Sequence, residues 1–176
     1  MTGRLDGELF GPPVKVDVKP DGEVVPQAGK AGYRRSIYSL QRRITPLTIL
    51  DVFDLPPMAP NCIERRQSTV PTQALQMMNG KTLRELSRYL AGRLIDEFGE
   101  DSQKQVEEVY FRVLSRRPTL RETEVALEGL QTLAKQWSTH LEVVKEEAPK
   151  TYTARWRALG DFCQTILTSA GFAYVD

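Results

Sequence analysis

The sequence has few of the residues that most often carry catalysis or hold metal ions. It contains one histidine, His140, and two cysteines, Cys62 and Cys163, which lie far apart in the chain. Zinc sites, haem attachment and histidine-based catalysis need several such residues at fixed spacings, and those spacings are missing. We therefore expect no metal site and no cofactor in this chain, and we name no catalytic residue. The two cysteines can form a disulfide or remain buried thiols, and the sequence leaves both alternatives open.

Long apolar runs and a strong net charge are missing as well. No stretch of about eighteen apolar residues occurs, so the sequence predicts no membrane span. The polar N-terminal residues 1–7 lack the apolar segment of a secretory signal. The formal net charge is only +1, which argues against nucleic-acid binding because proteins of that class usually carry a strongly basic surface. A content of 40% hydrophobic and 27% charged residues is ordinary for a globular protein.

The second half of the chain has the periodicity of amphipathic helices. Apolar residues recur there at spacings of three and four, which places them on one face of a helix. Thr119 and Glu122 have the spacing of a capping box. Gly99 and Gly171 are expected to end helices, and the apolar tail around Phe172 is expected to pack back onto the domain. The predicted helices cover 80–98, 102–114, 119 to about 137 with a solvated extension, and 151 or 153 up to 171.

The first part of the chain predicts a small β-hairpin. Val14, Val16 and Val18 alternate with charged residues, as in a half-buried strand. A turn at 19–22, rich in proline and glycine, is followed by a possible return strand at 23–25. The aromatic and β-branched residues of 33–43 favour an extended segment, with a helix as the alternative. Short helices are predicted over 46–53 and from Ser68 or Thr69 to about Met78.

Together these patterns predict a mainly α fold. The expected architecture is an irregular helical domain of about five to six helices with a small N-terminal β-hairpin. Three regions are expected within this one domain: a loop-rich segment with the hairpin over 1–32, an arginine-rich region with two short helices over 33–79, and a helical layer over 80–176.

Six arginines are concentrated in the second of these regions. They can form an anion pocket for the carboxylate or sulfate groups of a polysaccharide, because guanidinium groups bind oxyanions through two hydrogen bonds. The favoured alternative is that some pair with Asp51, Asp54 and Glu64 and brace the loops. The six are Arg34, Arg35, Arg42, Arg43, Arg65 and Arg66. The candidate ligand-binding residues are Arg34, Arg35, Arg65, Arg66, Gln73 and Asn79.

Several other polar residues of this region have a structural and a functional interpretation. Asp51 and Asp54 lie three apart on a predicted helix and resemble a catalytic pair, but capping or ion pairing is the commoner role. Pro71 is expected in the first turn of its helix. Gln73 is expected to be a buried anchor for the preceding loop, and Asn79 the cap of the next helix. The aromatic side chains are expected in the core rather than on a sugar-stacking surface; they are Trp137, Trp156, Phe162, Phe172 and Tyr174.

Several short motifs together resemble one protein family. They are the Tyr-Arg-Arg-Ser-Ile-Tyr run at 33–38, Phe53-Asp54, Cys62 with Arg65-Arg66, the 69–79 segment, the 111–119 junction, and the two C-terminal stretches 159–163 and 172–176. In order and spacing they are similar to domain of unknown function 1553, a family abundant in planctomycetes. The resemblance brings no catalytic residue to this chain.

The resemblance implies that the chain is the C-terminal part of a larger exported protein, located in the periplasm or outside the cell. An upstream companion domain is then its first partner, and any haem belongs to absent upstream modules. We expect a structural or binding module, with polysaccharide or another surface polymer as ligand. The alternative is the C-terminal half of a hydrolase or redox enzyme whose catalytic residues lie upstream. By itself the fragment is not expected to act as an enzyme.

Overall fold

The computed structural model describes residues 2–56, 71–144 and 153–173. These residues form two compact units. One, here called the small unit, is Arg4–Gln76, and the other, the helical unit, is Met77–Asp176 together with Met1–Gly3. Seven helices and one two-stranded sheet occur among the described residues, which confirms the predicted mainly α class with an N-terminal hairpin.

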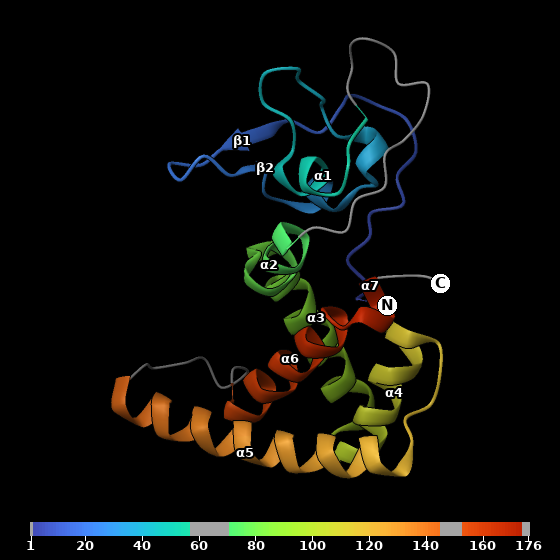
Figure 1. The fold of residues 1–176 in the computed structure, drawn as a ribbon, viewed down its shortest axis with the longest axis vertical. Coiled ribbons are helices and arrows are strands. Elements are labelled where there is room, and N and C mark those ends of the chain that lie inside the picture. Colours follow the sequence, from blue (N-terminus) through green and yellow to red (C-terminus); the bar gives the residue numbers. More distant parts are fainter. Residues whose placement is uncertain (1, 57–70, 145–152, 174–176) are drawn as a thin grey trace. The chain divides into compact units, whose positions relative to one another are not determined.

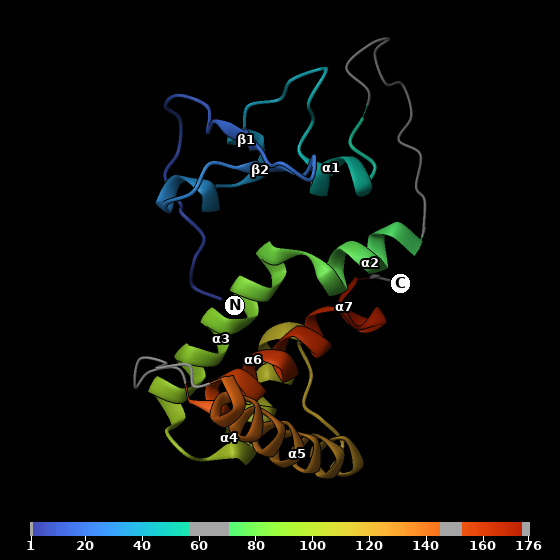
Figure 2. The same cartoon turned by 90° about the vertical axis from the view of Figure 1, so that its left-hand side faces the viewer.

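The helical unit is built from five helices around one apolar core. They are α3 (Lys81–Phe98), α4 (Ser102–Leu114), α5 (Leu120–Val144), α6 (Ala154–Leu167) and the short α7 (Ala170–Ala173). Helix α6 packs against both α3 and α5, and the two views show it lying beside them (Figures 1 and 2). The apolar faces predicted for these helices contribute to this core. Burying one large aliphatic or aromatic side chain stabilises a fold by about 1.5–3 kcal/mol. Its fully buried members include Leu90, Leu94, Val106, Val109 and Leu159.

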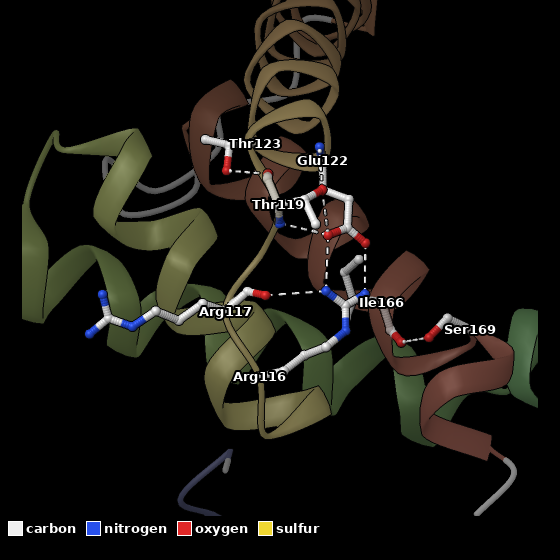
Figure 3. Close-up of polar contacts among 7 residues, drawn as sticks. All are labelled: Arg116, Arg117, Thr119, Glu122, Thr123, Ile166 and Ser169. Atoms are coloured by element: carbon white, nitrogen blue, oxygen red, sulfur yellow. Dashed lines mark hydrogen bonds and ion pairs between the residues drawn. The ribbon is translucent and has the colours of Figure 1, made fainter. Parts of the chain in front are cut away.

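Side chains close the ends of these helices largely as the sequence predicts. The Thr119 amide donates to Glu122 Oε2 at 2.8 Å, and the Glu122 amide donates to Thr119 Oγ1 at 3.3 Å (Figure 3). This reciprocal pair confirms the predicted capping box. Thr153 caps α6 in the same way, since its Oγ1 accepts from the Trp156 amide. Gly99, with a φ of 55°, ends α3 as expected.

Two predicted helix boundaries in this unit are wrong. Asn79 is the last residue of α2 rather than the cap of α3, and Gly80 takes the cap position with an extended backbone and no side-chain bond. Helix α6 ends at Leu167, and Gly171 lies inside α7 instead of ending the helix. The Ser169 carbonyl accepts from the amides of Phe172 and Ala173, so the chain turns once more after α6. Phe172 packs against the core as predicted.

The small unit contains the hairpin and several short turns. Strands β1 (Val16–Val18) and β2 (Val24–Pro26) pair antiparallel, with Val16 opposite Pro26. The Gly22 amide donates to the Lys19 carbonyl at 2.9 Å and closes the predicted turn. Helix α1 (Thr48–Val52) is joined to β2, because the Val24 amide donates to Thr48 Oγ1 at 2.9 Å. Helix α2 (Pro71–Asn79) begins at Pro71, in agreement with the prediction.

Residues 33–43 differ from both conformations considered from the sequence. One 3-10 turn, η1 (Lys30–Tyr33), ends at the first residue of the region, and a second, η2 (Ser36–Tyr38), lies inside it. Arg34 and Ser39 are extended, and each forms an isolated parallel bridge, to Asp6 and Val14 respectively. The favoured extended segment is therefore wrong over η2. The reason is that partners distant in the chain fix single residues as strand and leave the residues between them to form a turn.

Candidate binding surface around Arg34

Two isolated bridges hold the segments that carry the candidate surface. At one, the Asp6 amide donates to the Tyr33 carbonyl at 3.1 Å. At the other, the Val14 amide donates to the Tyr38 carbonyl and the Leu40 amide to the Val14 carbonyl, each at 2.8 Å. Residues 7–13 leave the first bridge and return at the second, so they form a loop with fixed ends. We call residues 8–12 the clamped loop.

The Arg34 guanidinium fixes the inside of this loop. It donates hydrogen bonds to the carbonyl oxygens of Glu8 at 3.2 Å, of Pro12 at 3.3 Å and of Phe10. Its carbon Cζ also lies 4.3 Å from the ring centroid of Tyr38, which is a cation–π contact. A rigid planar donor suits this position, because one side chain reaches three carbonyls at once.

Several backbone groups of the clamped loop are therefore already paired, while its large side chains are exposed. Arg34 occupies the carbonyls of Glu8, Phe10 and Pro12, and proline has no amide hydrogen to offer. Phe10 is 78% exposed and has a φ of 63°, a left-handed conformation that is rare for a bulky residue. Leu9 beside it is also exposed. An exposed phenylalanine held in a strained backbone by a neighbouring arginine is typical of a preformed contact point.

Asp6 supports the start of the clamped loop. Its side chain is buried, with the residue only 8% exposed. Its Oδ1 accepts from the Glu8 amide at 3.1 Å and lies 4.0 Å from Lys30 Nζ. The carboxylate thus satisfies a backbone donor at one end of the loop, while Arg34 satisfies the acceptors along it.

The structure assigns different surroundings to the predicted arginines. Arg34 is braced by backbone carbonyls instead of by the aspartates considered from the sequence. Arg35, Arg42 and Arg43 are exposed. Arg65 and Arg66 lie outside the described residues, together with Cys62 and Glu64. The anion pocket, and the ligand role of Arg34, Arg35, Arg65, Arg66, Gln73 and Asn79, stay predictions.

The two aspartates do not share a helix face. Asp51 is exposed in α1, whereas Asp54 lies beyond the end of that helix with a φ of 59°. The prediction failed because α1 is shorter than expected and ends at Val52. Gln73 is buried, as predicted, and its Nε2 donates to the Val52 carbonyl at the end of α1 at 3.1 Å, while most of the loop that it was expected to anchor lies outside the described residues. Asn79 is exposed.

The remaining chemically notable residues lie in the helical unit and hold it together. Cys163 is a free, fully buried thiol, and burial raises its pKa, so the thiol alternative holds for this residue. Trp156, Phe162 and Phe172 pack in or against the core as predicted. Trp137 Nε1 donates to Asp161 Oδ2 at 2.7 Å, which joins α5 to α6. His140 is exposed beside that tryptophan. Tyr174 lies outside the described residues.

Charged residues at the ends of α3, α4 and α5 form ion pairs rather than an open site. Arg112 binds Glu97 at 2.5 Å and Glu108 at 2.7 Å, and its hydrogen bond lowers the pKa of Glu97. Arg116 binds Glu122 and, with the Thr119 amide, lowers the pKa of Glu122 to about 2. Figure 3 shows the Arg117 guanidinium pointing away from this network.

The described residues contain neither a cluster of metal-binding side chains nor a helix that could span a membrane. Over 2–56, 71–144 and 153–173, no group of three or more histidine, cysteine, aspartate or glutamate side chains is placed to hold a metal ion. Within the same ranges, no helix combines the length and the apolar character that crossing a bilayer requires.

Sequence reasoning missed the residues that define the surface. It treated Leu9 and Phe10 as loop and did not consider Tyr38 as a partner of Arg34. The carbonyls that Arg34 binds lie 22 to 26 positions earlier in the chain, and no periodicity links them to it. The only available signal was the cluster of glycine and proline after Phe10, at Gly11, Pro12 and Pro13, which is typical of a tight turn.

Comparison with known proteins identifies the family. No curated protein and no solved structure matches the chain significantly. A family model does match, over residues 1–130 of the 176. The matched range includes the arginine-rich motifs and the 111–119 junction, which confirms the resemblance noted from the sequence. The chain belongs to the family described as PSD1, protein of unknown function (DUF1553).

Proposed function

We propose that this chain is a non-catalytic binding module of a larger exported bacterial protein of planctomycete type. In this proposal the small unit provides the contact surface and the helical unit serves as its scaffold. The clamp that Arg34 forms on the 8–12 loop is the observation that carries it. Three hydrogen bonds and a cation–π contact hold a loop whose Leu9 and Phe10 are exposed and whose backbone is strained. Loops ordered in this way are common at binding sites.

The difference between the two units supports this division of roles. The buried apolar residues of the helical unit form one cluster from several helices. The described part of the small unit buries only Val14, Val24 and Leu47 among its apolar residues, and it exposes many others. A surface with so much exposed apolar area for its size favours contact with a partner.

The partners that we propose are the upstream half of the same protein and a surface polymer such as a polysaccharide. The protein then acts in the periplasm or outside the cell, and any haem belongs to upstream modules. The exposed Arg35, Arg42 and Arg43 provide cationic groups for carboxylates or sulfates of such a polymer. The competing enzyme function is an outcome of the test below.

The test compares binding and turnover in the full-length protein. Arg34→Gln removes the clamp, and Arg117→Gln removes an exposed charge from the helical unit as a matched control. We expect the first change to weaken binding to an isolated upstream half, or to acidic glycans on an array, and the second to have a smaller effect. Circular dichroism establishes that the helical unit remains folded.

Two results would overturn the proposal. One is equal binding by the wild type and the Arg34→Gln variant. The other is a hydrolytic or redox activity of the full-length protein that disappears when an exposed residue of this chain, such as Asp51, is replaced while binding is retained. That second result would establish a catalytic role for this half.

A further inference from the structure

We infer that the small unit binds an anionic lipid surface, by inserting exposed apolar side chains between the headgroups while neighbouring arginines contact phosphates. The proposed residues are Phe10, Ile37 and Ile44 for insertion, and Lys30, Arg35, Arg42 and Arg43 for the headgroups. This inference rests on the proposed function only in taking the small unit as the contact surface.

The charge of this part of the chain is strongly one-sided. From Val24 to Leu50 the sequence contains five basic residues and no aspartate or glutamate. One of them, Arg34, is used in the clamp. The other four are exposed, and among the ion pairs between described residues Lys30 lies 4.0 Å from Asp6, with 85% of its side chain still accessible. The near-neutral net charge of the whole chain therefore conceals a local excess of exposed basic residues in this stretch of sequence.

Large apolar side chains stand among these charges. Ile37 is 82% exposed and follows Arg35 by two positions. Ile44 is 92% exposed and follows Arg42 and Arg43 directly. Phe10 comes from the clamped loop. Each is exposed on a turn or loop rather than on the face of a helix or strand. Each side chain can therefore insert into the headgroup region of a lipid bilayer independently of the others.

The bridges keep these residues on neighbouring segments. Asp6 pairs with Arg34, and Val14 pairs with Ser39, so Phe10 and Ile37 lie on the two arcs between the same pair of bridges. The Leu40 amide is bonded to Val14, and Arg42, Arg43 and Ile44 follow within four residues of that point. One contact surface can therefore include both the clamped loop and the segment from Arg35 to Ile44.

The combination of exposed apolar and basic side chains favours an anionic lipid surface over a protein interface or an acidic polysaccharide. The core of a protein interface is usually depleted of charge, and its anchors fill pockets, whereas here Ile37 and Ile44 lie within two positions of an exposed arginine in the chain. A sulfated polysaccharide would use the charges but gain little from isoleucine. At the boundary between headgroups and acyl chains, apolar side chains are buried while basic side chains reach the phosphates, and both kinds contribute.

The test is sedimentation of the full-length protein with vesicles of phosphatidylcholine alone or with about one third phosphatidylglycerol. We expect binding to the anionic vesicles only, and weaker binding at high salt because screening reduces the attraction. Arg42→Gln and Arg43→Gln should each weaken partitioning about fivefold, the effect of one basic residue near a charged membrane. Ile37→Ser, Ile44→Ser and Phe10→Asn should each weaken it roughly tenfold. Asparagine is used because it tolerates a positive φ.

Matched controls come from the helical unit. Leu120 is 87% exposed, and Arg117 is exposed with its guanidinium pointing away from Glu122, so Leu120→Ser and Arg117→Gln remove the same chemistry elsewhere. Neither should change partitioning. Equal losses from the control and test variants would refute the inference, as would equal binding to both kinds of vesicle or none to either.

A ligand other than a lipid surface would give a different pattern of binding among these variants. Loss of binding with the arginine variants but not with the isoleucine variants, together with retention on dextran sulfate, would overturn the lipid assignment in favour of a polyanionic polymer. Failure to bind vesicles while the upstream half still binds would refute this inference alone. Failure of both would refute the proposed function as well.

Discussion

Replacing Arg34 by glutamine should release the 8–12 loop without unfolding the helical unit. The guanidinium makes three hydrogen bonds to backbone carbonyls and stacks on Tyr38. For partly exposed groups a net value of about 0.5 kcal/mol for each hydrogen bond and a similar value for the stacking are reasonable. The sum is about 2 kcal/mol, which raises the population of the opened loop about thirtyfold.

Chymotrypsin provides a direct assay, because it cleaves after Leu9 and Phe10, which are both exposed. A protease needs an extended stretch of backbone, so the clamped loop must open before cleavage. We expect Arg34→Gln to be cut at this site about thirty times faster than the wild type at low protease concentration. Arg35→Gln, which changes an exposed neighbour, should be cut at the wild-type rate. An increase of less than threefold, or an equal increase in both variants, would refute the clamp.

Four further predictions concern the stability of the fold. Thr119→Ala removes the helix cap and should lower the free energy of unfolding by about 1 kcal/mol in urea titration. Because the pKa of Glu122 is lowered from 4.5 to about 2, its contribution to the free energy of unfolding is complete above about pH 4.5 and is lost as the pH falls towards 2. Glu122→Gln should flatten the dependence of stability on pH over that window, and an unchanged dependence would contradict this. Gln73→Leu leaves the Val52 carbonyl unpaired and should cost about 1–3 kcal/mol, measured by denaturation of the small unit. Leu94→Ala should cost about 2–5 kcal/mol of the helical unit's stability.

The sequence predicted the helical unit well because its signals are local. Helix α3 carries apolar residues at spacings that follow its own period, and the capping box depends on two residues three positions apart. The exact ends were harder, since Gly80 rather than Asn79 precedes α3 and only the geometry of the chain distinguishes them. Periodicity identifies a helix but leaves its last turn open.

The small unit could not be predicted to the same extent because its structure depends on distant partners. Single bridges from Asp6 and Val14 fix Arg34 and Ser39, so a local preference at 33–43 decides little. Arg34 was expected to bind carboxylates, but backbone carbonyls carry no residue-specific signal that a sequence can show. Gln73 was predictable as a polar residue on an otherwise apolar helix, which must find a partner when buried.

The same dependence on a few distant contacts explains why the small unit suits a contact role. With Val14, Val24 and Leu47 as its buried apolar residues in the described part, it gains little from hydrophobic burial. Individual polar contacts, such as the Arg34 clamp and the Gln73 bond, then account for a large share of its order. A partner that covers Phe10 or Ile37 would add the burial that the unit lacks. Binding and folding of the small unit should therefore be coupled, and a bound partner should protect the 8–12 loop from chymotrypsin even in Arg34→Gln.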